Sequence, residues 1–102
     1  MVDKNELKIK DRVGGNPKKT LDKIINNKNT DSNFKAREIK NLLNAIGEEI
    51  QTKAATHHRY KVQNSLGTKK PISFAEIKSD VKPAYIKTIR SNLMELMEEE
   101  DD

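Results

Sequence analysis

Two adjacent histidines, His57 and His58, are the side chains of this 102-residue chain best suited to acid–base or metal chemistry. Neighbouring residues on a helix point about 100° apart, so the pair cannot hold one ion from one helical face. The chain has no other histidine and no cysteine, and no carboxylate lies three or four residues from either histidine. We therefore expect no metal site and no cofactor. The pair is expected to serve as surface groups, or as extra cations near a phosphate below about pH 6.5.

The segment 14–20, with the sequence Gly-Gly-Asn-Pro-Lys-Lys-Thr, has the composition of a phosphate-binding loop. A P-loop requires a glycine directly before its lysine, whereas this segment has Pro17, whose nitrogen carries no hydrogen. We expect instead a flexible basic arm that contacts phosphates without specificity.

Enzymatic chemistry finds little support in the sequence. Cysteine is absent, and the serines lie in polar runs and candidate helix caps. The clustered carboxylates at 48–49 and 98–102 are expected to face water. With 33% hydrophobic residues the chain has little room for a water-excluding pocket. We expect a protein that is not an enzyme and has no small-molecule substrate.

Positive charge is concentrated in the second half of the chain. Residues 52–92 carry nine cations and two anions, a net charge of +7, whereas residues 93–102 carry six anions and no cation. A basic surface favours contact with nucleic-acid phosphates, because Lys and Arg displace condensed counterions. Mixed charge facing water for solubility is the alternative interpretation.

Apolar residues recur at helical steps, which predicts an all-α fold, a small bundle of three to four helices. One predicted helix begins near Phe34 and carries Ile39, Leu42 and Ile46, and the same spacing continues weakly as far as Leu66. The chain is expected to divide into a flexible, partly ordered basic N-terminal arm (1–33), a helical domain (34–98) and an acidic tail (99–102).

Two further helices are predicted after Gly67. Ser73 and Glu76 have the spacing of a capping box, which places a short helix from Phe74. Pro83 fits the first turn of a longer helix.

A short capped helix, a tight turn and a longer basic helix are the parts of a helix-turn-helix, so we expect a small DNA-binding protein of that type, with a role as a regulator. The turn at 79–82 lacks the frequent glycine, and an ordinary helical hairpin is the alternative. The expected nucleic-acid contacts are basic, hydroxyl or aromatic side chains: Lys53, Arg59, Lys61, Lys78, Lys82, Tyr85, Lys87, Thr88, Arg90 and Ser91. A single surface containing these cations would favour nucleic acid, and scatter would favour a protein-interaction module.

The interaction module is the alternative function. Leu93, Met94, Leu96 and Met97 cluster on the last predicted helix, and Met-rich helical surfaces adapt to partner proteins or to a second copy of the chain. No apolar run reaches the ~18–20 residues of a membrane span, and the first residues lack the apolar stretch of a signal peptide. We expect a soluble, cytoplasmic protein without a membrane partner.

Overall fold

The chain folds as a mixed α/β protein, so the all-α prediction is wrong. The computed structural model describes residues 3–26 and 34–101. In chain order the elements are η1 (Lys4–Glu6), η2 (Ile9–Arg12), α1 (Gly15–Asn26), β1 (Phe34–Lys35), α2 (Ala36–Ile46), β2 (Glu48–Ile50), β3 (His57–Gln63), β4 (Lys69–Ala75), β5 (Asp80–Val81) and α3 (Pro83–Glu100).

A three-stranded antiparallel sheet with the order β2-β3-β4 replaces the helices expected between residues 48 and 81. In β3 the buried residues Tyr60 and Val62 alternate with exposed Arg59 and Lys61, and β4 alternates in the same way. This period of two is the strand period. The His58, Val62 and Leu66 spacing that suggested a helix is therefore a chance match, because only every second residue of β3 faces the core.

The capping-box prediction is wrong for the same reason. Ser73 lies exposed in the middle of β4, between buried Ile72 and Phe74, and pairs across to Arg59. Cross-strand burial outweighs a local capping signal worth about 1 kcal/mol. Without a helix in this segment there is no helix-turn-helix.

The predictions of helices around Ile39 and from Pro83 are confirmed. In α2 the residues Ile39, Leu42 and Ile46 are completely buried, but the helix ends at Ile46 and does not continue to Leu66. Helix α3 begins at Pro83 and runs to Glu100.

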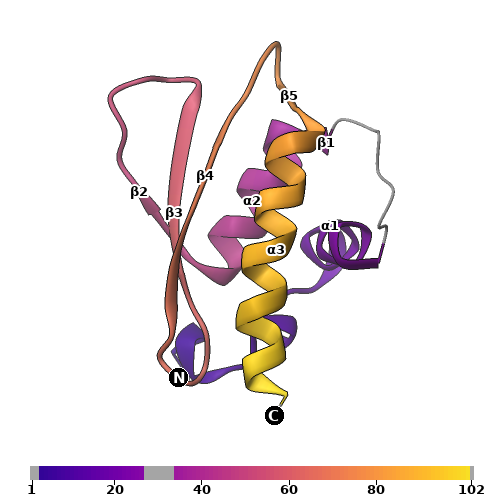
Figure 1. The fold of residues 1–102 in the computed structure, drawn as a ribbon, viewed down its shortest axis with the longest axis vertical. Helices are drawn as coiled ribbons and strands as arrows, with labels where there is room; N and C mark the ends of the chain where they lie inside the picture. The colour runs from indigo at the N-terminus through magenta and orange to yellow at the C-terminus, as the bar shows by residue number, and fades with distance from the viewer. Residues whose placement is uncertain (1–2, 27–33, 102) are drawn as a thin grey trace.

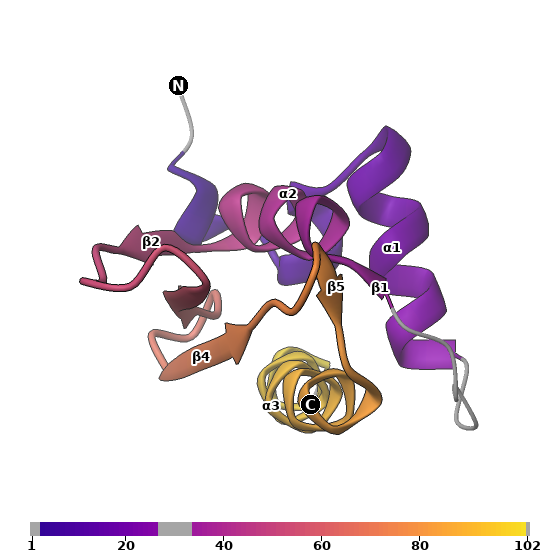
Figure 2. The ribbon, with the colours of Figure 1, turned by 90° about the horizontal axis from the view of Figure 1, so that it is seen from above.

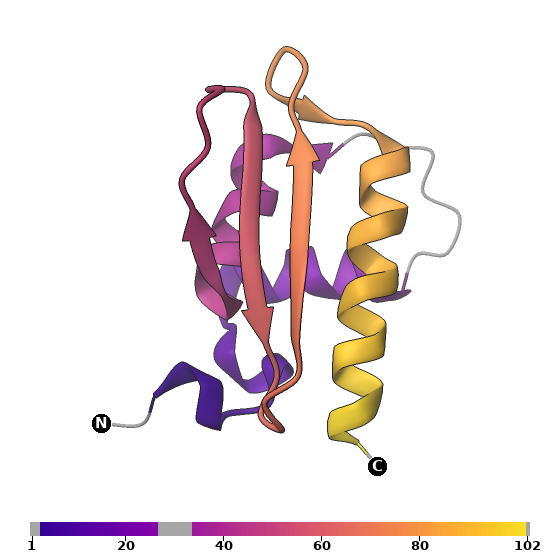
Figure 3. The same ribbon diagram turned by 60° about the vertical axis from the view of Figure 1, so that its left-hand side comes forward.

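The molecule has three layers, as Figures 1 and 2 show. The sheet forms one layer, α2 and α3 lie side by side on one of its faces, and α1 packs on the far side of these two helices. Figure 3 shows α3 beside β4, the last strand of the three-stranded sheet. No helix within residues 3–26 and 34–101 covers the other face of the sheet.

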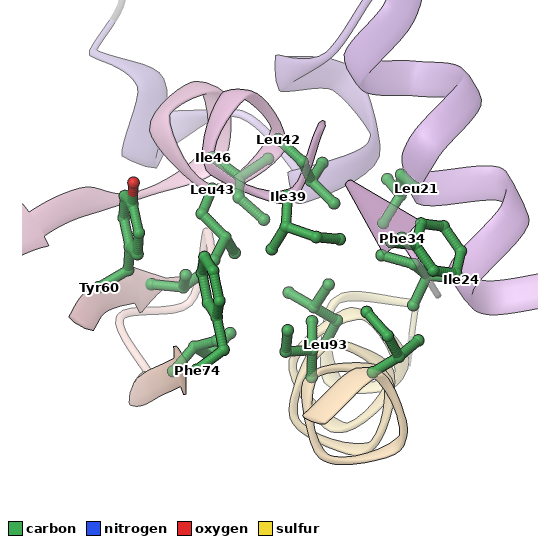
Figure 4. Close-up of a cluster of buried hydrophobic side chains, with 14 of the residues drawn as sticks. Leu21, Ile24, Phe34, Ile39, Leu42, Leu43, Ile46, Tyr60, Phe74 and Leu93 are labelled. Atoms are coloured by element: carbon green, nitrogen blue, oxygen red, sulfur yellow. The ribbon is translucent and has the colours of Figure 1, made fainter. Parts of the chain in front are cut away.

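The core lies between the layers and includes part of the N-terminal segment. Leu21 and Ile24 of α1 reach the side chains of α2 and α3, as Figure 4 shows. Ile9 of η2 is completely buried as well. Part of the segment before α1 therefore joins the core, whereas Ile77, in the connection between β4 and β5, is 53% exposed.

Candidate nucleic-acid interface

The face of the sheet that no described helix covers carries outward-facing polar side chains from all three strands. Its exposed residues, which we call the open face, are Glu48, Ile50, His57, Arg59, Lys61, Lys69, Pro71 and Ser73. Three cations stand there against one carboxylate. Neighbouring strands lie about 4.8 Å apart, so the register brings these groups onto one compact surface.

Strand β3 forms the centre of the open face. Arg59 lies between Ile50 of β2 and Ser73 of β4, and Lys61 lies between Glu48 and Pro71. Strand alternation turns both cations outward, because Tyr60 between them and Val62 after them fill the core. Burial of the apolar side chains therefore fixes the orientation of the basic ones.

The ten residues predicted to bind nucleic acid do not form one surface. Arg59 and Lys61 lie on the open face, Lys53 is exposed in the β2–β3 connection, and Lys78 is exposed in the β4–β5 connection. Lys82 directly precedes α3, and the remaining five are on α3, which packs on the opposite face of the sheet: Tyr85, Lys87, Thr88, Arg90 and Ser91. Only two of the predicted residues therefore contribute to the open face. The scatter counts against the basic surface predicted from the sequence, so nucleic-acid binding has to be argued from the open face alone.

The residues predicted to bind a protein partner lie mainly inside the molecule. Leu93 and Leu96 are completely buried core residues of α3. Met94 and Met97 are half-buried, and Met97 packs against the core. These side chains hold α3 in place.

A histidine–carboxylate pair lies at the end of the sheet and was missed in the sequence. The Nε2 atom of His58 is 2.7 Å from an Oε2 oxygen of Glu76, and the Nζ atom of Lys40 on α2 is 3.5 Å from the same oxygen. Only 10% of the His58 side chain is exposed. The hydrogen bond to His58, assisted by the charge of Lys40, holds the pKa of Glu76 below its usual value.

The pairing of β3 with β4 creates this cluster. His58 lies opposite Phe74, and the backbone N–H of Glu76 donates to the carbonyl of Thr56 at 2.9 Å. On a helix, residues 18 apart are separated by about 27 Å along the axis, so an interpretation that searched three or four residues from each histidine did not consider Glu76. The alternation of apolar and polar residues in β3 is the sequence signal that would have predicted a strand there and placed His58 on the same side as Tyr60 and Val62.

His58 also lines a hollow of about 330 Å³ that reaches the open face. Its lining includes the outward-facing His57 and Arg59, together with Ser73 and, from α3, Tyr85. An acid–base group thus lies beside cations that face solvent. Among residues 3–26 and 34–101, no three His, Cys, Asp or Glu side chains come together as a metal site would require. Within the same described residues, no helix is long and apolar enough to cross a membrane.

Comparisons of the chain with protein-family models, with curated proteins and with solved structures found no match. The function of the protein is therefore inferred from its own geometry.

Proposed function

We propose that the protein binds nucleic acid, with RNA preferred over DNA, through the open face of its sheet. The observation that carries this proposal is the outward alternation of His57, Arg59 and Lys61 along β3, on a face that no described helix covers. Cations on such a surface neutralise phosphates, while the histidine and nearby Ser73 add hydrogen-bonding groups.

The shape of this surface favours RNA. A helix inserted into the DNA major groove was the basis of the DNA prediction, but strands β4 and β5 lie where the first helix of the expected pair would be. The minor groove of A-form RNA is wide and shallow and displays phosphates and 2′-hydroxyls, which suit a broad polar sheet. The open face carries no aromatic residue, so base stacking contributes little to binding there.

The binding test compares two variants with equal loss of charge. Arg59→Gln/Lys61→Gln removes two cations from the open face. Lys82→Gln/Lys87→Gln, the α3 variant, removes two exposed cations at the N-terminal end of α3, one of them on the residue that directly precedes the helix. Fluorescence anisotropy measures affinity for an RNA duplex, a single-stranded RNA and a DNA duplex of the same sequence over a range of salt concentrations.

We expect the open-face variant to bind the RNA duplex at least tenfold more weakly at low salt and to show a shallower salt dependence, by roughly one to two counterions. The α3 variant should lose less than threefold. Equal losses, a larger loss in the α3 variant, or salt-insensitive binding would refute the proposal, and tighter binding to DNA would reverse the preference for RNA.

A second candidate function is cleavage of the bound RNA, and the His58–Glu76 hydrogen bond favours it. A carboxylate that holds one ring nitrogen orients a histidine for proton transfer at the other nitrogen. As a base, His58 would take the proton of a 2′-hydroxyl, whose oxygen attacks the adjacent phosphorus. The P–O5′ bond then breaks, the protonated His58 returns the proton to the departing 5′-oxygen, and a 2′,3′-cyclic phosphate remains.

Denaturing gels of end-labelled RNA test cleavage directly. The wild-type protein should cut RNA but not the matching DNA, which lacks the 2′-hydroxyl. His58→Gln should abolish cleavage while leaving RNA affinity within threefold of wild type, and Glu76→Gln should slow cleavage. Retention of full activity by His58→Gln would eliminate this function without affecting the binding proposal.

A further inference from the structure

A second basic hollow lies between α1 and α2, in the helical layers and away from the open face. It has a volume of about 490 Å³. Helix α1 lines it with residues spaced at helical steps, and α2 lines it with Arg37, Glu38 and Asn41. The residues from α1 are Asn16, Pro17, Lys19, Thr20 and Lys23.

Three cations face this hollow, while only one carboxylate does. Lys19, Lys23 and Arg37 are exposed, and within the described part of the chain none of them takes part in an ion pair. The carboxylate of Glu38 already accepts a hydrogen bond from the backbone N–H of Lys35, at 3.2 Å. Among the described residues, the hollow therefore has an excess of positive charge that no ion pair neutralises.

The arrangement of these cations is unfavourable for the isolated fold. Lys19 and Lys23 are four residues apart on one helix face, where like charges repel. The first turn of α1 contains no acidic residue that would complement the helix dipole. An anion bound in the hollow would reduce the repulsion between the two lysines and would complement the dipole of α1. Locally unfavourable charge of this kind is typical of binding sites, where the ligand supplies the opposite charge.

We propose that the hollow between α1 and α2 binds a phosphate-bearing ligand through Lys19, Lys23 and Arg37. The amide groups of Asn16 and Asn41, which also line the hollow, supply neutral hydrogen bonds to phosphate oxygens. The segment 14–20 thus contributes to a phosphate site through a helical face, although it cannot form a P-loop. The phosphate belongs either to a free polyphosphate or to a nucleic-acid backbone.

Two variants with equal charge change test this site. Lys19→Gln/Lys23→Gln/Arg37→Gln removes the cations of the hollow, and Lys10→Gln/Lys18→Gln/Lys87→Gln removes three exposed cations outside it. Isothermal titration calorimetry with sodium pyrophosphate tests the free-ligand source, and anisotropy with the RNA duplex tests the backbone source. Thermal denaturation confirms that each variant is folded.

We expect pyrophosphate to bind the wild type and the control variant equally well and the hollow variant at least tenfold more weakly. Arg59→Gln/Lys61→Gln should leave pyrophosphate affinity unchanged, so failure of this site and failure of the open face are distinguishable. If pyrophosphate does not bind but RNA affinity falls only in the hollow variant, the ligand is a nucleic-acid backbone. Equal losses in the hollow and control variants, or no loss with either ligand, would overturn the proposal.

Discussion

At the scale of single residues, burial and hydrogen bonding decide which polar groups are structural. Asn64 is completely buried, and its amide donates to the carbonyl of Leu96 while its oxygen accepts from the backbone of Leu66 and Thr68. Arg12 donates to the carbonyls of Leu7, Ile46 and Gln63. Neither residue has the type or position that sequence patterns associate with a core, so only the folded structure identifies their roles.

Tyr60 provides a prediction at this scale, because its fully buried hydroxyl makes no hydrogen bond. Burial and the nearby charge of Glu49 raise its pKa to about 12, and the side chain of Asn44, whose geometry falls short of a hydrogen bond, partly offsets the shift. A pKa raised on folding means that the protonated form stabilises the native state. Stability should therefore fall between about pH 10 and pH 12, by up to roughly 2–3 kcal/mol.

Urea denaturation of Tyr60→Phe and Tyr85→Phe at pH 7 and pH 11.5 measures this effect. Tyr60→Phe should be at least as stable as wild type at pH 7, since it removes an unsatisfied buried hydroxyl, and should lose less stability at high pH. Tyr85→Phe, at a position that is 38% exposed, should behave as wild type does. An alkaline loss in Tyr60→Phe as large as that of the wild type would disprove the assignment.

At the scale of elements, the junction between α2 and β2 depends on the absence of a side chain. Gly47 follows α2, and a Cβ atom there would lie 2.6 Å from the carbonyl oxygen of Lys61 and 2.9 Å from a methyl group of Val62. The close approach lets β2 pair with β3 directly after the helix ends. The glycine was visible in the sequence, but its function depends on a strand 14 residues away.

Gly47→Ala should therefore destabilise the protein by about 1–3 kcal/mol, because the neighbouring carbonyl belongs to a strand and cannot move freely. Gly14→Ala is the matched control, since a Cβ there meets no atom within 4 Å. Thermal denaturation of both variants measures the difference. Equal melting temperatures for the two variants would contradict the steric argument.

At the scale of the whole molecule, Glu100 joins the two ends of the chain. Its carboxylate, only 8% exposed, accepts a hydrogen bond from the backbone N–H of Ile9 at 3.0 Å and another from Ser65 at 2.7 Å. The residues at 99–100, expected as part of an acidic tail, thus attach α3 to the N-terminal segment and to the β3–β4 turn. Glu99 has a pKa below its usual value, chiefly because Thr68 and Asn64 donate hydrogen bonds to it.

Glu100→Ala leaves two backbone donors without this acceptor and should cost about 2–4 kcal/mol. Glu98→Ala removes an exposed carboxylate from the same turn of α3 and should change stability by less than about 0.5 kcal/mol. Hydrogen exchange of residues 8–12 should accelerate in Glu100→Ala alone. Unchanged protection of this segment would show that Glu100 does not hold it.

The sequence by itself determined the helices around Ile39 and after Pro83, since an apolar face repeated at helical steps specifies a helix whatever it packs against. Only the tertiary structure decided that residues 57–63 and 69–75 form strands, because the short period-two alternation of these segments competes with helical spacings, and cross-strand burial outweighs local signals such as the Ser73 cap. The open face and the His58–Glu76 pair follow from that same pairing. They consist of contacts between residues far apart in the chain, which no local pattern encodes.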